Sequence, residues 1–206
     1  MLTKTLTDTT TTSVPYSTSG QTRTWTNTWS DALLASIKTP NGNTTKYGYD
    51  SSGALTSTTD AKGHVTNITS HTGGGLPLTI VDPNAVTTTL TYSPRLWLTS
   101  STVSGTSGTY KTTSTYDAAG NLTQTTLPDS SYVANTFDTA HRLIKVTDAL
   151  GNYTSYTLDA LGDRTQTSIY VKGGSTASWQ RTDSFDALGR LLVDTHRADG
   201  HSLRPP

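Results

Sequence analysis

Apolar and polar residues alternate along this chain in short stretches, each bounded by turn-forming residues. Residues Leu122–Thr126 alternate as in a strand, Pro128–Ser131 have the composition of a turn, and Tyr132–Phe137 return as a second strand. The same plan follows at Leu143–Thr147, Asp148–Asn152 and Tyr153–Leu158. The pattern predicts β-hairpins, each joined to its neighbour by a second tight turn.

One phrase, Tyr-Asp-x-x-Gly-x-Leu, begins each predicted hairpin. Its clearest copies are residues 49–55 and 116–122, and variants occupy residues 137–143, 158–164 and 185–191. Two degenerate copies begin at Ser70 and Tyr92. The copies recur about every 21 residues, and a period of this length is typical of one supersecondary unit stacked on itself.

Each position of the phrase has a structural role. We expect the Asp carboxylate to accept backbone N–H groups within the turn, the Gly to adopt positive φ, and the aromatic residue to stack along one face of the sheet. The residues of this predicted repeat signature are Tyr49, Asp50, Gly53, Asp60, Gly63, Tyr92, Tyr116, Asp117, Gly120, Phe137, Asp138, Asp148, Gly151, Asp159, Gly162, Phe185, Asp186 and Gly189.

The predicted fold is all-β: a continuous antiparallel strip of hairpin repeats that is coiled by strand twist. Composition agrees, because Thr is abundant and favours strands, whereas Glu is absent. We expect about seven repeats over residues 22–196, with a protruding hairpin loop at Lys172–Ser178. Residues 1–21 are Thr- and Ser-rich without alternation and are expected to be frayed or disordered, and residues 197–206 form a patternless tail.

Charge and composition exclude several classes of protein. Formal net charge is zero and the basic residues are scattered, which argues against nucleic-acid binding. No apolar run approaches the roughly 18 residues of a membrane span, and the N-terminus has no signal-peptide core. The chain has no Cys, so disulfides and thiolate chemistry are excluded.

The titratable residues do not form a catalytic pattern. The repeated Asp residues share one turn position, so capping explains them. His64 falls just after a turn glycine, and His141 falls at the glycine position of the phrase, where His tolerates left-handed geometry. His196 and His201 have Asp neighbours, but their spacing matches no metal-ligand motif. Residues 105–108 lack the nucleophile elbow, and residues 73–75 lack the Lys and helix of a phosphate loop. We therefore expect a non-enzymatic protein with no cofactor, metal or catalytic residues.

One binding hypothesis remains open. Aromatic residues on an extended polar sheet are suited to stack on sugar rings, and Trp97 and Trp179 are the main candidates. The alternative is that these rings pack between repeats, as aromatic residues of this periodicity usually do.

The phrases at residues 116–122, 147–152 and 185–191 resemble the YD repeats of RHS proteins, and residues 92–99 resemble a further phrase of bacterial members. The resemblance covers roughly residues 28–195. It implies an open segment of a large hollow β-shell that, in bacterial relatives, encloses a C-terminal toxin delivered by type VI or related secretion. Animal teneurins use a similar shell for adhesion.

The resemblance also implies partners. These are further RHS repeats of a longer chain, an enclosed toxin domain and, under the adhesion alternative, surface glycans. Full-length relatives are secreted or at the cell surface. The self-cleaving core block of the family has no recognisable counterpart here, and Asp82–Pro83 is a dipeptide inside a repeat turn. With no polar cap at either end, the chain is expected to be a segment of a longer array.

Overall fold

The computed structural model describes residues 2–7, 20, 22–198 and 201–202, and every regular element among them is a β-strand. The chain divides into two compact units. The first comprises residues 1–90 and 102–109, and the second comprises residues 91–101 and 110–206. Each unit is an antiparallel sheet in which consecutive strands are neighbours.

In the first unit, the strands form one antiparallel ladder in chain order. They are β1 (Leu2–Thr7), β2 (Thr22–Ser30), β3 (Leu33–Lys38), β4 (Thr44–Tyr49), β5 (Leu55–Thr59), β6 (Val65–His71), β7 (Pro77–Val81) and β8 (Thr87–Tyr92). Strand β8 and the next two strands, β9 (Leu98–Gly105) and β10 (Gly108–Tyr116), have residues in both units.

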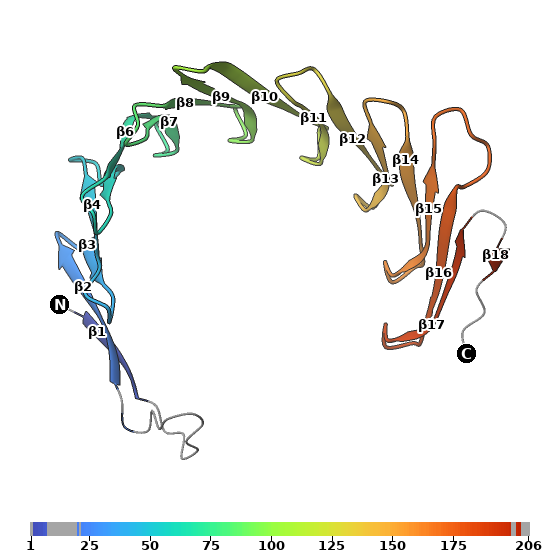
Figure 1. Ribbon diagram of the computed structural model, residues 1–206, viewed down its shortest axis with the longest axis horizontal. Helices are drawn as coiled ribbons and strands as arrows, with labels where there is room; N and C mark the ends of the chain where they lie inside the picture. The colour runs from blue at the N-terminus through green and yellow to red at the C-terminus, as the bar shows by residue number, and fades with distance from the viewer. Residues whose placement is uncertain (1, 8–19, 21, 199–200, 203–206) are drawn as a thin grey trace. The chain divides into compact units, whose positions relative to one another are not determined.

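The second unit continues in the same way, again with antiparallel pairing of consecutive strands. Its strands are β11 (Leu122–Thr126), β12 (Tyr132–Phe137), β13 (Leu143–Asp148), β14 (Tyr153–Leu158), β15 (Arg164–Tyr170), β16 (Trp179–Phe185), β17 (Leu191–Ala198) and β18 (His201–Ser202). Figure 1 shows the turns of this unit alternating between the two ends of its strands.

The hairpin plan read from the sequence is confirmed. The strands predicted at residues 122–126, 132–137 and 153–158 have those bounds, and the loop predicted at residues 172–178 lies between β15 and β16. The expectation of a frayed N-terminus is wrong for Leu2–Thr7, which forms β1 and pairs with β2 along its full length. The rest of that segment, apart from Gly20, lies outside the described residues.

The patternless tail also differs in part from expectation. Strand β17 extends to Ala198, and β18 pairs with it through two residue pairs. Pairing with β17 explains why these tail residues form a strand. A backbone without side-chain alternation still gains ladder hydrogen bonds when a free strand edge is next to it. The remaining tail residues lie outside the described part of the chain.

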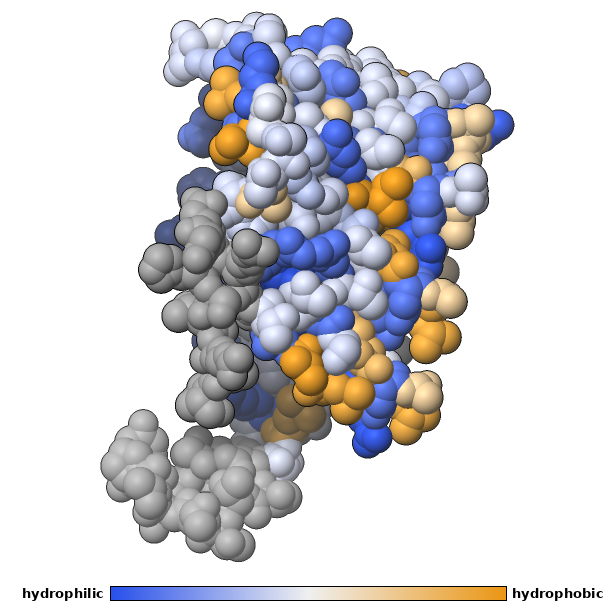
Figure 2. Space-filling model, turned by 90° about the vertical axis from the view of Figure 1, so that its right-hand side faces the viewer, coloured by the Kyte–Doolittle hydropathy of each residue, from blue (hydrophilic) through white to orange (hydrophobic). Residues whose placement is uncertain are grey.

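Neither sheet has an apolar core. Among the described residues no hydrophobic side chain is buried, and the three buried residues are Ser100, Ser168 and Asp183. Large apolar side chains are instead exposed at turn tips, with Leu161 at 72% and Leu188 at 77% exposure. Figure 2 shows apolar side chains scattered among polar ones on the face it presents. Stability therefore comes from strand pairing and turn contacts between neighbouring repeats.

Two families of turn alternate along the chain. The signature turns follow the anchor residues and begin at Asp50, Thr72, Ser93, Asp117, Asp138, Asp159 and Asp186. The linking turns join one repeat to the next and begin at Thr39, Asp60, Asp82, Leu127 and Asp148. Because antiparallel strands reverse at every turn, the two families lie at opposite ends of the strands (Figure 1).

A β-bulge next to the signature turns distinguishes the two families. Tyr116 pairs with Leu122 and Thr115 pairs with Gln124, so Thr123 has no partner across the ladder. Shifts at the corresponding place occur at Gly48/Tyr49, Thr136/Phe137, Thr157/Leu158 and Ser184/Phe185. No shift occurs at linking turns such as that between Thr126 and Tyr132. A bulge bends and twists its strand, so each repeat carries this bend beside its signature turn.

Threonine hydroxyls satisfy the backbone at these bulges. The Thr123 hydroxyl donates to the carbonyl oxygen of Thr115 at 3.1 Å. Thr165 donates to the carbonyl oxygen of Thr157 at 3.3 Å. At these bulges a Thr hydroxyl thus supplies a hydrogen bond to a backbone carbonyl oxygen of the ladder. Because Thr also favours strands, this role accounts for part of its abundance.

The anchor residues bind the backbone of the preceding repeat. The Tyr116 hydroxyl donates to the carbonyl oxygen of Leu98 at 2.9 Å, and the Tyr49 hydroxyl donates to that of Leu34 at 3.0 Å. The anchor ring of Tyr116 also contacts Trp97, with centroids 5.4 Å apart. At Tyr116 and Tyr49, the anchor is therefore joined to the preceding repeat by a hydrogen bond, rather than by the predicted stacking of anchor rings.

We expect Tyr116→Phe to lower the free energy of unfolding by about 0.5–1.5 kcal/mol, because it removes the hydroxyl that satisfies Leu98. Urea unfolding followed by circular dichroism measures the change. Tyr132→Phe is the matched control, since no hydrogen bond to the Tyr132 hydroxyl is found among the described residues. Equal midpoints for the two variants would show that the anchor hydroxyl contributes nothing.

Candidate functional site

The signature and linking turns share one backbone geometry. In the turn that starts at Asp117, the Asp117 N–H donates to the carbonyl oxygen of Asn121 at 3.1 Å, and the Gly120 N–H donates to that of Asp117 at 3.2 Å. The same two bonds close every turn named above. Both ends of the strands therefore carry one five-residue motif.

The fourth residue of each turn has left-handed backbone geometry. Gly53 and Gly120 have φ of 85° and 98°, as predicted for the signature glycines. His141, predicted to replace Gly in this role, has φ of 62°. Leu96 and Ser130 occupy the same position at 64° and 69°, although neither residue type identifies it in the sequence. Non-glycine residues here carry a cost of roughly 1–2 kcal/mol, which the turn hydrogen bonds offset.

A carboxylate holds most of these turns closed. Asp117 Oδ1 accepts the N–H groups of Ala119 and Asn121, both at 2.9 Å. The corresponding pair of bonds, to the third and fifth turn residues, is made by Asp50, Asp60, Asp82, Asp138, Asp159 and Asp186. The predicted capping role of the signature aspartates is confirmed.

These hydrogen bonds favour the ionised carboxylate. The Asn121 side-chain amide lowers the pKa of Asp117, and the backbone N–H of Arg142 lowers that of Asp138. The pKa of Asp186 is lowered in the same way, first by the backbone N–H of Arg190. Donors that point at the charged form stabilise it, and folding is therefore coupled to ionisation.

Turns without an initial Asp use weaker or displaced caps. The Ser93 hydroxyl accepts the N–H of Arg95 at 3.3 Å and that of Trp97 at 3.2 Å. In the turn that begins at Leu127, Asp129 instead accepts the N–H and hydroxyl of Ser131. The motif thus tolerates substitution provided that some oxygen receives the inner N–H groups.

In the second unit, the fifth residue of a signature turn reaches the next signature turn. The Trp97 ring lies so close to Gly120 that a Cβ added there would be 2.8 Å from Trp97 Cζ2. Arg95, from the same turn as Trp97, donates a hydrogen bond to the carbonyl oxygen of Ala118 and lies 5.2 Å above the Trp97 ring. Two consecutive turns are therefore packed together by a Trp and an Arg.

Polar side chains make the same connection farther along the chain. Asn121 Nδ2 lies 2.7 Å from Asp117 Oδ2 in its own turn and 2.9 Å from His141 Nδ1 in the next. Arg142 Nε lies 2.8 Å from Asp138 Oδ2, and its Nη1 donates to the carbonyl oxygen of Asp159 at 2.7 Å. We call this column of connected signature turns the turn ladder.

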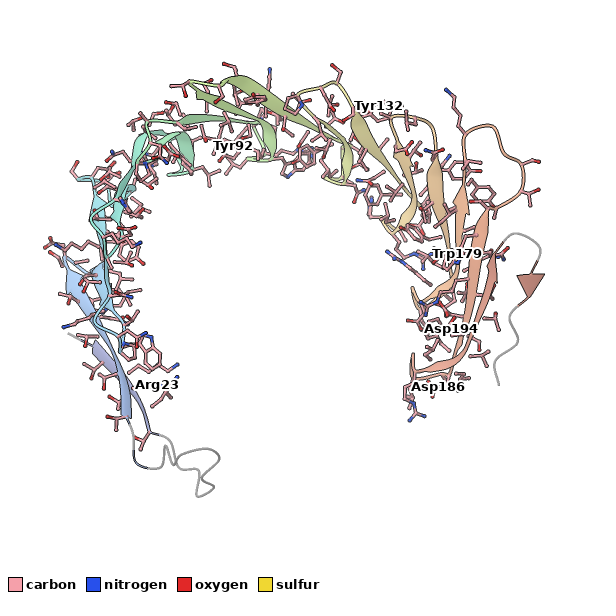
Figure 3. The ribbon with its side chains drawn as sticks, viewed as in Figure 1. Arg23, Tyr92, Tyr132, Trp179, Asp186 and Asp194 are labelled. Atoms are coloured by element: carbon pink, nitrogen blue, oxygen red, sulfur yellow. The ribbon has the colours of Figure 1, made fainter. Side chains whose placement is uncertain are left out.

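An ion cluster lies between β16 and β17, away from the turn ladder. Arg181 Nε is 2.9 Å from Asp183 Oδ1 and 3.3 Å from Asp194 Oδ1, and the two aspartates are direct partners across the strands. Figure 3 labels Asp194 in this part of the sheet and Asp186 in the turn beyond it. One guanidinium thus neutralises part of two facing carboxylates, and the Asp183 carboxylate raises the pKa of Arg181.

The candidates for chemistry and binding lie apart. His64 pairs with Asp60 at 2.8 Å within one linking turn, and Trp97 is half-buried in the turn ladder. Trp179 starts β16 opposite Ile169 (Figure 3). Within the described part of the chain, no group of three or more His, Cys, Asp or Glu is placed to hold a metal. The side chains of His196 and His201 lie outside the described residues.

Sequence reasoning missed the fifth turn residues. Asn121 and Arg142 connect successive turns, yet they differ in chemistry from each other and from Trp97. Their common feature is the place directly after the left-handed residue. Aligning the repeats by turn position would have identified these fifth residues.

Comparison with known proteins agrees with this architecture. The RHS Repeat family matches residues 29–66 and 137–176. No curated protein matches the chain in sequence. Among the described residues, no helix has the length and apolar character needed to cross a membrane.

Solved structures share the fold at low sequence identity. A crystal structure of TcdB2–TccC3–Cdc42 matches with a TM-score of 0.68 and 16% identity, covering 84% of this chain and 10% of that one. TcdB2–TccC3 without its hypervariable C-terminal region gives 0.66 and 17%, covering 84% and 10%. A Tc holotoxin pore of Photorhabdus luminescens gives 0.54 and 18%, covering 85% and 9%. The chain spans about a tenth of the length of the solved chains it matches.

We expect Gly120→Ala to lower the free energy of unfolding by about 2–4 kcal/mol, because the added methyl group meets Trp97 in a left-handed backbone. Gly173→Ala is the matched control: Gly173 has φ of 75° but open space around it, so the expected loss is about 1–2 kcal/mol. Urea unfolding of both variants measures the difference. A loss at Gly120 no greater than at Gly173 would contradict the close contact between the turns.

Stability should fall with acid. The folded pKa values of the capping aspartates are lowered below the ordinary value of 3.8, so their contribution is complete above that pH and is lost as pH falls through the lowered values. Urea midpoints measured from pH 6 to pH 2 should drop below about pH 4. The triple variant Asp117→Asn, Asp138→Asn, Asp148→Asn should show a shallower acid response, and equal responses in the two proteins would contradict the capping role.

Proposed function

We propose that this chain, a member of the RHS repeat family, is a non-enzymatic wall segment of a β-shell that encloses a toxin used between bacteria. The observation that carries the proposal is the turn ladder: consecutive repeats are joined by strand pairing and by contacts between turns, with no apolar core among the described residues. A sheet built in this way extends by adding repeats rather than by thickening.

The edge of β17 supports the proposal that the first partner of this chain is a further set of RHS repeats. Strand β17 pairs with β16 from Leu191 to Ala198, whereas among the described residues its other side pairs with β18 only at Arg197 and Ala198. Leu192 beside this edge is 63% exposed. Backbone groups on a free edge and exposed apolar side chains favour the docking of another strand.

The likeness to TccC3-containing structures supports a toxin-associated shell, because those chains belong to TcdB2–TccC3 and Tc holotoxin assemblies. An enclosed toxin domain is accordingly the proposed second partner. Export to the cell surface or medium, by type VI or related secretion, is part of the same proposal and rests on the family resemblance. A mechanical role also agrees with the signature aspartates, whose carboxylates are engaged within their own turns.

Glycan adhesion is the alternative role, and one observation weighs against it. A sugar needs an open ring face, whereas the Trp97 ring packs against Gly120 and Tyr116. If adhesion were the function, glycan-array binding would be seen and would be lost in Trp97→Ala or Trp179→Ala.

The shell proposal predicts that the natural polypeptide containing these repeats protects its cargo from trypsin. We expect the double variant Asn121→Ala, Arg142→Ala to expose the cargo, because both connections from one turn to the next are removed. Limited proteolysis followed by mass spectrometry of cargo peptides measures the exposure.

His64→Ala is the matched control for that experiment. The His64 ring pairs with Asp60 of its own linking turn at 2.8 Å, outside the turn ladder, so its removal should leave the cargo protected. Rapid digestion of the cargo in the unaltered polypeptide would contradict enclosure. Equal protection in the double variant would contradict the wall role of the turn ladder.

A further inference from the structure

The hairpin of β2 and β3 in the first unit departs from the repeat plan. Ser30 pairs directly with Leu33, so the loop between β2 and β3 contains only Asp31 and Ala32, with φ of 49° and 63°. Two consecutive residues of positive φ are typical of a tight two-residue hairpin turn. The residue after this turn, Leu33, lies near the next signature turn, where a Cβ added at Gly53 would be 3.8 Å from Leu33 Cδ1.

A hollow of about 630 Å³ lies beside this contact. The short turn contributes Ser30 and Asp31 to its lining, the sheet contributes Leu33, Tyr47 and Tyr49, and the next signature turn contributes residues 50–53. All of these residues belong to the first unit. The hollow thus lies between two consecutive turns and has aromatic side chains among its walls.

The lining is acidic and aromatic, and it contains no Lys, Arg or His. Asp50 uses Oδ1 to accept the N–H groups of Ser52 and Ala54, and these bonds together with the Ser52 hydroxyl keep its pKa low. Asp31 is exposed and receives one hydrogen bond, from the Ser30 hydroxyl at 3.2 Å. Two carboxylates with no cation among the lining residues favour a positively charged ligand.

The chain itself shows which cation fits between two signature turns. Arg142 places its guanidinium between the Asp138 carboxylate of one turn and the Asp159 carbonyl oxygen of the next. Arg95 bridges its own turn and Ala118 while lying over an aromatic ring. In both cases a planar guanidinium joins consecutive turns, whereas the lining between Asp31 and Asp50 contains no cationic side chain.

We propose that this hollow binds an arginine side chain presented by an extended segment of a partner polypeptide. The guanidinium would donate to the Asp31 and Asp50 carboxylates and lie against Tyr47 or Tyr49. Arg suits this place better than Lys, because its planar group both forks onto carboxylates and stacks on rings. The site would give the wall one specific contact with the chain that it encloses or adjoins.

Nuclear magnetic resonance titration of the full chain tests the proposal. The probe is acetyl-Gly-Arg-Gly-amide, and the matched probe is the same peptide with citrulline, which has nearly the same shape but no charge. We expect saturable shifts at the amides of Asp31 and residues 47–53, with at least tenfold weaker binding of the citrulline peptide. Tenfold corresponds to about 1.4 kcal/mol, a modest value for a charge-assisted contact.

Two variants locate the site. Asp31→Asn should weaken binding of the arginine peptide about tenfold without altering the turn, because Asn tolerates left-handed geometry. Ala35→Trp should abolish binding by filling the hollow, since Ala35 lies in its wall. Asp129→Asn, which changes a turn carboxylate outside the hollow, is the control and should bind as the unaltered chain does.

Three results would overturn the proposal. Equal binding of the arginine and citrulline peptides would show that charge plays no part. Unchanged binding by Asp31→Asn would place the ligand elsewhere. Shifts of the same amides by maltose, without a response to arginine, would identify a sugar site and favour the adhesion alternative.

Discussion

The structure depends on one turn, in which an oxygen at the first residue receives the inner N–H groups and the fourth residue has left-handed geometry. Asp117 shows it completely, with Oδ1 bound to two backbone N–H groups and Gly120 at φ of 98°. In most domains an apolar core fixes the geometry of such turns. Here no apolar side chain among the described residues is buried, so the turns themselves must fix the register of the strands.

A turn that closes locally does not by itself join one repeat to the next, and three further features do so. The bulge beside each signature turn bends the strand, the anchor hydroxyl of Tyr49 or Tyr116 binds the backbone of the preceding repeat, and the fifth turn residue contacts the next turn. All three lie at one end of the strands. The linking turns at the other end lack the bulge, which gives each repeat a direction.

Much of this architecture could be predicted from the sequence. Alternation and the spacing of Asp and Gly located the strands and the capped turns, because both follow from local backbone geometry. His141 was identified at a glycine position for the same reason, and its φ of 62° confirms it. Local rules of this kind need no knowledge of the neighbouring repeat.

The contacts between repeats were not predictable in the same way. Trp97, Asn121 and Arg142 occupy one place with three different chemistries, so no residue type marks it. Strand β1 was missed because Leu2–Thr7 has no alternation and gains its order from pairing with β2. The hollow at Asp31 lies between two consecutive turns, a neighbourhood that becomes visible only when the turns are seen side by side.

Hydrogen exchange at the Asn121 amide is the most direct test of the turn as the organising interaction. This N–H donates to Asp117 Oδ1 at 2.9 Å. The account predicts slow exchange in the unaltered chain and a selective loss of protection at Ala119 and Asn121 in Asp117→Ala, with β10 and β11 still protected. Fast exchange at Asn121 in the unaltered chain, or unchanged protection in the variant, would contradict it.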